Sequence, residues 1–220
     1  RDSYGSRGLG DVYKRQCLSI TSDKSGFLWI GTNEGLNRFD GYSPEIYRSN
    51  PFDSTALSGN KIFDTYTDKD GSLWVSTDKS IDKYLHGSNS FKRFFTGTSP
   101  TFATEDNSGN IWVATLSNGL FRIKKENNEV TNYKFSPLDP TSISSNQFSH
   151  TQNTSIVIDN NDDLWIATRN GLNFFDSSSG IFKRFYSKID DASTISSNVI
   201  NSIYFDGDFL WAGSSKGLDK

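Results

Sequence analysis

Several residue types are scarce in this sequence, and each scarcity excludes a class of protein. The chain of 220 residues has one cysteine, Cys17, and two histidines, which excludes an internal disulfide and a structural zinc site built from Cys and His. Its hydrophobic runs are far shorter than the roughly 20 residues that cross a bilayer, and no signal peptide precedes them. Methionine is absent even from position 1, so we expect the chain to be a piece of a longer one.

Basic charge and proline are also scarce. The net charge is -3, which leaves no basic face to displace counterions from phosphates and argues against nucleic-acid binding through this chain. Five prolines beside 17 Phe, 9 Tyr and 5 Trp exclude a collagen-like or disordered chain. Because the apolar residues are largely aromatic and β-branched, the composition favours strands.

A repeat centred on tryptophan organises what is present. The five tryptophans lie 38 to 53 residues apart, each within Asp-x-x-Gly-x-(Leu/Ile)-Trp, followed by an apolar residue, a small residue, Thr or Ser, and then x-x-Gly-(Leu/Ile), with small departures. They are Trp29, Trp74, Trp112, Trp165 and Trp211. Asp-x-x-Gly predicts a tight turn between a first and a second strand, and Thr-x-x-Gly predicts a turn into a third. Segments that alternate rings and cations, such as 91–95 and 182–186, then predict a fourth, solvent-edge strand.

Four short antiparallel strands every 45 residues or so are typical of a β-propeller blade. We therefore expect an all-β fold, a partial β-propeller of about four and a half four-stranded blades from a larger ring, with approximate blades at 17–49, 60–95, 100–135, 154–187 and 199–220. The tryptophans are expected to anchor neighbouring blades, each stabilising the fold by roughly 4 to 6 kcal/mol. Residues 1–16 have no counterpart in the repeat, and we expect a non-native or disordered tail there.

A second motif recurs in the connectors between blades. Segments 50–60, 136–146 and 188–198 share an Asp, then Ser or Thr, an apolar residue, Ser and Asn at fixed offsets. The connector at 96–100 lacks this motif, Ser80 replaces the second Gly of its repeat, and Asp162 replaces the first Gly of another, so we expect weaker turns there. Together, the two motifs closely resemble the two-component regulator propeller repeat over residues 17–220.

The resemblance implies a function for the parent chain. Proteins with this repeat are typically the periplasmic sensor parts of hybrid two-component histidine kinases from Bacteroidota, anchored in the inner membrane by a helix that would lie downstream of this segment. Their usual ligands are oligosaccharides released from glycans, and their output is transcription of polysaccharide-utilisation genes. We therefore expect a non-enzymatic, carbohydrate-sensing segment of a homodimeric receptor. A secreted propeller glycoside hydrolase or lyase, and a protein-interaction scaffold, remain the alternatives.

Candidate binding residues lie where the repeats differ. Asn60, Asn146 and Asn198 recur in the connectors, so we interpret them as capping residues that bond the backbone. The Thr-x-x-Gly turns and the connectors should share one rim, and the variable turn residues suit sugar hydroxyls or uronate carboxylates unless they are only solvated turn tips. The connector before Trp165 is about five residues longer than its counterparts, and we expect it to carry an aromatic outward that could stack on a sugar, unless it is a drifted surface loop. The candidates are Glu34, Asp78, Lys79, Phe148, His150, Arg169 and Asn170.

Catalytic, metal and cofactor motifs are weak. Asp159-x-Asn161-x-Asp163 is only faintly similar to a calcium loop, because Asn170 stands where an EF-hand places its Glu. No Ser/His/Asp set or phosphate loop is evident. We expect no catalytic residue, no metal and no cofactor, although carboxylates are numerous enough that sequence alone does not exclude a glycosidase pair.

Overall fold

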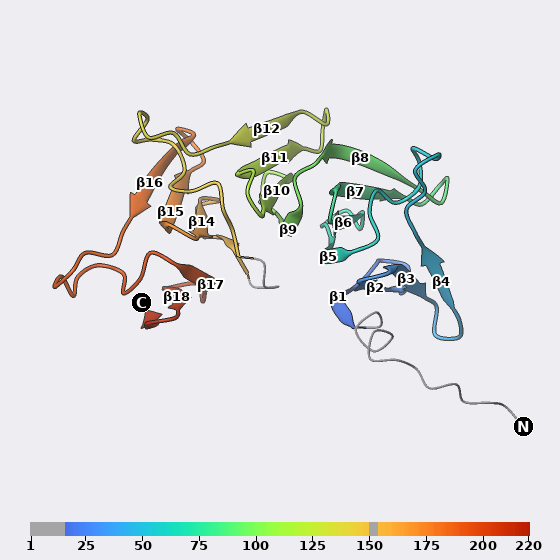
Figure 1. Ribbon diagram of the computed structural model, residues 1–220, viewed down its shortest axis with the longest axis horizontal. Helices are drawn as coiled ribbons and strands as arrows, with labels where there is room; N and C mark the ends of the chain where they lie inside the picture. Colours follow the sequence, from blue (N-terminus) through green and yellow to red (C-terminus); the bar gives the residue numbers. More distant parts are fainter. Residues whose placement is uncertain (1–15, 150–153) are drawn as a thin grey trace, which may run out of the picture. The chain divides into compact units, whose positions relative to one another are not determined.

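The computed structural model describes residues 16–149 and 154–220 and contains only strands, turns and connectors in those ranges (Figure 1). The expectation of a tail at 1–16 therefore lies almost entirely outside the described residues. The strands form four-stranded sheets in chain order, followed by a three-stranded one. The chain divides into two compact units, residues 1–97 and 98–220.

The first unit holds two antiparallel sheets. The first sheet consists of β1 (Cys17–Ser22), β2 (Leu28–Thr32), β3 (Gly35–Phe39) and β4 (Pro44–Tyr47). The second consists of β5 (Ile62–Thr67), β6 (Leu73–Thr77), β7 (Ser80–Leu85) and β8 (Ser90–Thr96). Each strand pairs with its sequence neighbour, so every sheet is a meander.

The second unit holds three sheets of the same topology. The third sheet consists of β9 (Pro100–Glu105), β10 (Asn110–Thr115), β11 (Leu120–Lys124) and β12 (Val130–Tyr133). The fourth consists of β13 (Ile156–Ile158), β14 (Leu164–Thr168), β15 (Gly171–Asp176) and β16 (Ile181–Phe185). The fifth consists of β17 (Ile200–Phe205), β18 (Leu210–Ser214) and β19 (Gly217–Asp219). This is the predicted β-propeller architecture, with each tryptophan on the second strand of a sheet.

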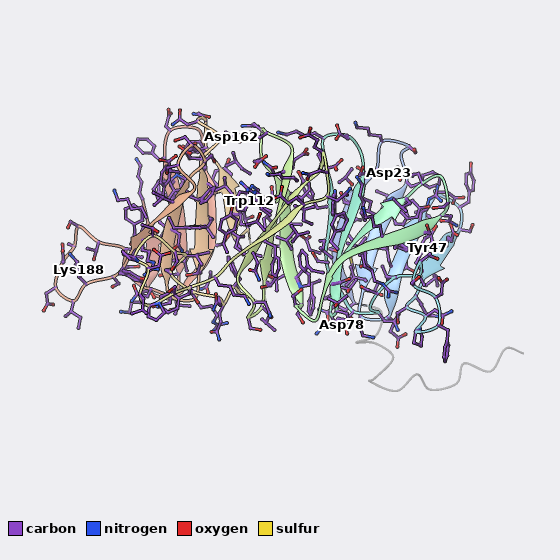
Figure 2. The ribbon with its side chains drawn as sticks, turned by 90° about the horizontal axis from the view of Figure 1, so that it is seen from above. Asp23, Tyr47, Asp78, Trp112, Asp162 and Lys188 are labelled. Carbon is purple, nitrogen blue, oxygen red and sulfur yellow. The ribbon has the colours of Figure 1, made fainter. Side chains whose placement is uncertain are left out.

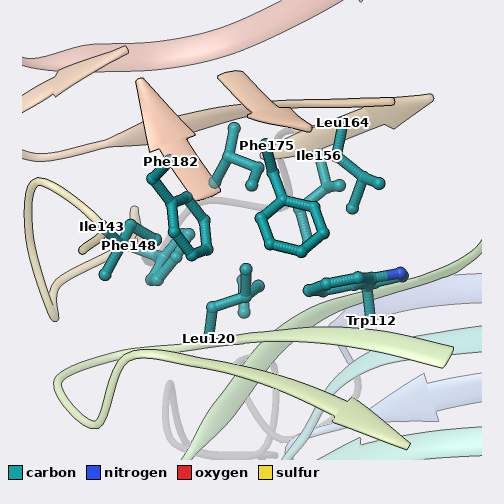
Figure 3. Packing of buried hydrophobic residues seen from close by; sticks show 10 residues of the cluster. Trp112, Leu120, Ile143, Phe148, Ile156, Leu164, Phe175 and Phe182 are labelled. Carbon is teal, nitrogen blue, oxygen red and sulfur yellow. The ribbon is translucent and has the colours of Figure 1, made fainter. Parts of the chain in front are cut away.

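Trp29 and Trp112 pack between neighbouring sheets of one unit, as predicted. In the first unit, Trp29 is fully buried against Val75 and Tyr84 of the second sheet. In the second unit, Trp112 is buried against Leu164 and Phe175 of the fourth sheet (Figure 3). In both cases the tryptophan side of one sheet meets the opposite side of the next. Trp74 is also buried, whereas Trp165 and Trp211 are half-buried.

In most repeats, the Asp of the Asp-x-x-Gly turn also bonds the tryptophan, which the turn pattern alone does not predict. In four repeats, its carboxylate accepts a hydrogen bond from the indole Nε1–H of the tryptophan, at 2.7 to 3.0 Å. The pairs are Asp23–Trp29, Asp68–Trp74, Asp106–Trp112 and Asp206–Trp211. Asp159 accepts two backbone N–H groups of its turn, but within the described residues it makes no such bond with Trp165. The Asp therefore fixes both the turn and the indole in most repeats.

The two glycine replacements have compensating contacts. Asp162 adopts a left-handed φ of 66°, and its carboxylate accepts hydrogen bonds from Asn107 N–H and Ser108 Oγ–H in the neighbouring third sheet. Ser80 is fully buried, and its hydroxyl bonds Ser58 of the connector. The expectation of weaker turns did not take into account the hydrogen bonds that the Asp162 and Ser80 side chains form in place of Gly.

Candidate ligand-binding rim

One edge of each unit carries the Thr-x-x-Gly turns and the connectors, and we call this edge the rim. Figure 2 shows Asp78 of a Thr-x-x-Gly turn at the opposite edge of the first unit from Asp23 of an Asp turn. In each Thr-x-x-Gly turn, the Thr or Ser hydroxyl donates to the carbonyl of the residue at the Gly position, as with Thr32 to Gly35 at 2.8 Å. The turn backbone is thus held from within.

The recurring connector Asn residues are backbone caps, as predicted. The side-chain oxygen of Asn60 accepts the Ser49 N–H at 2.8 Å, and Asn146 and Asn198 accept the N–H groups of Phe135 and Ser187 in the same way. Each Asn therefore closes a connector onto its own beginning. These Asn residues therefore recur for a structural reason, and we do not propose that they contact a ligand.

A buried polar latch, which sequence reasoning missed, ties each motif-bearing connector to the third strand of the following sheet. The N–H of the connector Ser donates to a side chain of that strand: Ser58 to Asp82 at 2.7 Å, Ser144 to Asn173 at 2.8 Å, and Ser196 to Asp219 at 3.0 Å. The third sheet, which follows the connector without the motif, has Phe121 at this position. The missing connector motif and the apolar residue at this strand position are both visible in the sequence, and their coincidence could have revealed the latch.

The latch residue of the second sheet is ionisable. Asp82 is fully buried, and burial raises the pKa of its carboxyl above the ordinary value, although hydrogen bonds from Ser80 and Ser58 oppose that rise. Asn173 has the same place in the fourth sheet with a neutral amide, which accepts from Ser144 N–H and donates to Ser144 Oγ. The site therefore needs an acceptor oxygen and does not need a charge.

Arginines of the fourth strands clamp the connectors from the other side. Arg184 donates from Nε to the Ser142 carbonyl at 2.6 Å and from its terminal nitrogen to the Asp139 carbonyl at 2.7 Å. In the first unit, a terminal nitrogen of Arg93 donates to the carbonyls of Asp53 and Ala56 at 3.3 and 3.0 Å. Each such connector is thus fixed at both ends before any ligand arrives.

A cleft of about 340 Å³ opens on the rim of the second unit. It is lined by Leu116, Ser117, Gln147, Phe148 and Arg169, which come from two Thr-x-x-Gly turns and the connector that joins their sheets. The connector bonds both turns, because consecutive carbonyls, of Asn146 and Gln147, accept the N–H groups of Gly119 and Arg169 at 2.9 and 3.0 Å. The cleft is therefore framed by backbone hydrogen bonds.

The candidates of the second unit are partly brought together. Arg169 and Asn170 are exposed at the turn, and Arg169 lines the cleft. The expectation that Phe148 is carried outward is wrong, because its side chain is fully buried with Ile143 and Trp112 (Figure 3). A large ring gains more from burial than from exposure on a loop, so the longer connector folds it inward. His150 lies outside the described residues.

The candidates of the first unit lie on its own rim. Glu34, Asp78 and Lys79 are all exposed. The carbonyl of Glu34 accepts from Arg48 Nε at 3.1 Å, and Glu34 and Arg48 line a hollow of about 520 Å³ on the first sheet. Asp78 lies against the connector, where a side chain at Gly59 would collide with its carboxylate. Sequence reasoning did not indicate the cleft-lining residues Leu116 and Gln147.

A larger hollow, of about 670 Å³, lies beside the connector 187–196 and β19. In the second and fourth sheets, the equivalent space holds the arginine of the fourth strand, Arg93 or Arg184. Among the described residues, no three His, Cys, Asp or Glu side chains are grouped to hold a metal ion. No helix in the same ranges is long and apolar enough to span a membrane.

Comparison with known proteins agrees with this architecture. The extracellular domain of the putative hybrid two component system BT4673 from B. thetaiotaomicron aligns with a TM-score of 0.70 and 19% identity, covering 91% of this chain and 26% of that one. The corresponding domain of BT3049 from B. thetaiotaomicron gives a TM-score of 0.55 and 21% identity, covering 96% and 41%. Virginiamycin B lyase from Staphylococcus aureus gives 0.61 and 16%, covering 91% and 64%. At these identities the likeness shows the fold alone.

Sequence comparison is more specific. Residues 56–79 match the family model described as two component regulator propeller. A segment of 41 residues, 19% of this chain, is 56% identical to Histidine kinase P4 from Formosa agariphila and covers 3% of its length. The chain thus spans a small part of that relative. The chain is therefore similar to this family over residues 56–79, and the Asp68–Trp74 hydrogen bond of that segment recurs in three other repeats of the chain.

Proposed function

We propose that this chain is an extracytoplasmic sensor segment of a hybrid two-component histidine kinase, and that it recognises glycan-derived oligosaccharides. The observation that carries the proposal is the family repeat at residues 56–79, together with the segment 56% identical to a histidine kinase. The fold likeness to extracellular domains of two component systems supports it. In this role the parent chain is a periplasmic, inner-membrane receptor whose output is transcription of polysaccharide-utilisation genes.

The rim provides the ligand-binding surface in this proposal. Its cleft combines the half-buried Leu116 with hydroxyl, amide and guanidinium groups, which is the mixture that fixes a polar ligand in orientation. The connectors are pinned by latch, cap and arginine clamp, so a ligand finds a preorganised surface. Such a stiff unit transmits ligand arrival as a change in the geometry of the receptor dimer.

Calorimetry of the chain against a panel of plant and host oligosaccharides, with chromatography of the mixtures, tests this function. We expect saturable binding with the oligosaccharide recovered unchanged. Deletion of the parent gene should abolish glycan-induced transcription of the neighbouring utilisation genes. Absence of binding across the panel, together with unchanged transcription, would contradict the proposal.

A propeller hydrolase or lyase is the second candidate, because a lyase is among the proteins with this fold. The same experiment separates the two functions, since an enzyme would convert the oligosaccharide and release product. The gene sequence downstream of this segment also discriminates between them. A membrane helix followed by a kinase core supports the sensor.

A further inference from the structure

The Thr-x-x-Gly turns of the two units differ in charge. In the second unit, the turn pairs are Ser117-Asn118, Arg169-Asn170 and Ser215-Lys216, which carry two cations and no carboxylate. In the first unit the pairs are Asn33-Glu34 and Asp78-Lys79, which carry two carboxylates and one cation. The Thr-x-x-Gly turns of the second unit are therefore better suited to an anion than those of the first unit.

The cleft on the second unit contains one of these cations. Arg169 is the charged residue among its five lining residues, and its guanidinium makes no hydrogen bond or ion pair with any described residue. Ser117 and Gln147 supply a hydroxyl and an amide, and the half-buried Leu116 supplies apolar surface, while Phe148 is fully buried beneath the cleft. A planar guanidinium fork matches a carboxylate or a sulfate, and a volume of about 340 Å³ suits one or two sugar rings.

The cleft is also held in shape without a ligand. The Arg169 N–H is bonded to the Gln147 carbonyl, and the Leu116 N–H to the Ser99 carbonyl at 3.0 Å. Thr168 accepts the Asn170 N–H and bonds Ser144 of the latch. The turn that presents Arg169 is therefore fixed at three successive positions, 168 to 170, and a ligand need order only the arginine side chain.

We propose that this cleft binds the oxyanion of an acidic sugar, a uronate carboxylate or a sulfate ester, through Arg169. The inference rests on the proposed oligosaccharide function and names its ligand class. Arg169 is the specificity residue, Ser117 and Gln147 bond ring hydroxyls, and Leu116 contacts a sugar face. A neutral sugar makes the same contacts except the ion pair with Arg169, so it binds more weakly.

Calorimetry with matched sugar pairs tests the proposal on the whole chain. One pair is a galacturonic acid disaccharide and its methyl ester, and the other is a sulfated N-acetyllactosamine and its unsulfated form. We expect at least one acidic member to bind about tenfold or more tightly than its neutral partner, and more weakly at high salt. The pair that shows the preference identifies the anion.

The matched variants are Arg169→Gln and Lys216→Gln, which each remove one cation from a Thr-x-x-Gly turn of the second unit. Arg169 is exposed, so both variants should melt like the wild type. Arg169→Gln should abolish the acidic preference, Arg169→Lys should keep part of it, and Lys216→Gln should change it less than about twofold. Equal effects of Arg169→Gln and Lys216→Gln would overturn the proposal.

The outcomes also separate this inference from the function on which it rests. If a neutral sugar binds as well as its acidic partner and Arg169→Gln does not alter its affinity, Arg169 is not the specificity residue, while oligosaccharide recognition stands. If none of the four sugars nor any of the wider panel binds, oligosaccharide recognition fails and this inference fails with it.

Discussion

Some side chains in this repeat form hydrogen bonds with two structural features at once. The Asp carboxylates that bond both the turn backbone and the tryptophan indole are the example. Asp106 accepts the Asn110 N–H at 2.7 Å in its turn and the indole N–H of Trp112 at 2.7 Å. Asp159 has only the turn role. An indole buried between sheets needs an acceptor, because an unpaired N–H there would lose its hydrogen bond to water.

This difference predicts unequal effects of the same substitution. Asp106→Asn should lower the free energy of unfolding by about 2 kcal/mol, because an amide presents a donor to one of the N–H groups that the carboxylate now accepts. Asp159→Asn, in the same unit, should cost less than about 1 kcal/mol. Thermal unfolding of the two variants by calorimetry measures the difference. Equal losses would show that the indole bond contributes nothing beyond the turn.

The latch carboxylate predicts a pH dependence. Burial raises the pKa of Asp82 above its ordinary 3.8, so the folded state binds this proton more tightly than the unfolded state does. Its stabilising contribution is complete below the ordinary pKa and is lost as pH rises through the raised one. Asp82→Asn should therefore be more stable than the wild type at neutral pH, by about 1 kcal/mol, and the advantage should shrink as the medium is acidified.

Unfolding of wild type and Asp82→Asn by urea across a pH series measures this. The reciprocal change, Asn173→Asp, introduces a buried carboxyl into the equivalent latch and should destabilise the chain at neutral pH, with relief in acid. Parallel stability curves for Asp82→Asn and the wild type would contradict the assignment of the latch as a proton-binding group.

At the scale of elements, the close approach of the first sheet to the second depends on Gly31, the small residue two places after Trp29. A β-carbon at Gly31 would lie 2.6 Å from Cγ2 of Ile62 in the next sheet and would also collide with Ser19. At the equivalent Gly213, the nearest atom would be the Ser202 carbonyl oxygen at 3.7 Å.

Gly31→Ala should therefore lower the free energy of unfolding by about 1 to 3 kcal/mol, since buried Ile62 has little room to move. Gly213→Ala should be neutral or slightly stabilising, because it removes backbone freedom from the unfolded chain without a collision. Calorimetric melting of both variants compares them. A neutral Gly31→Ala would show that the sheets can separate without cost.

Sequence predicted the elements well because each is locally encoded. The Asp and Gly turns and the strand with Trp29 and its four counterparts follow from residues a few positions apart, and the Asn60-type caps were recognised because the Asn recurs at a fixed place in three connectors. The latch was missed because Ser58 and Asp82 lie 24 residues apart and meet only once the sheet has folded. The outward placement of Phe148 was wrong for a related reason, since loop length gives no information about the apolar cluster beneath the loop.

At the scale of the whole molecule, one sheet face in each unit carries exposed apolar side chains among the described residues. Strand pairing places Tyr204 and Leu218 on the same side of the fifth sheet as Trp211, and both are about two-thirds exposed. Pairing also places Ile20 and Ile46 on the side of the first sheet opposite Trp29, and both are at least half exposed. Within each unit, the tryptophan side of one sheet packs on the opposite side of the next. The exposed face of the fifth sheet can therefore pack on the exposed face of the first sheet of another copy, as neighbouring sheets do within a unit.

We therefore expect the chain to associate head to tail in a concentration-dependent way and to be poorly soluble. Lysines at Tyr204 and Leu218 should block one face, and lysines at Ile20 and Ile46 the other, so each double variant alone should be monomeric by light scattering. Because each retains one intact face, their mixture should form a dimer and nothing larger. Lysine at Leu138, an exposed connector residue, should leave association unchanged. A wild type that is monomeric and melts cooperatively, or a double variant that still associates alone, would contradict head-to-tail pairing, because a symmetric contact would use one face on both copies.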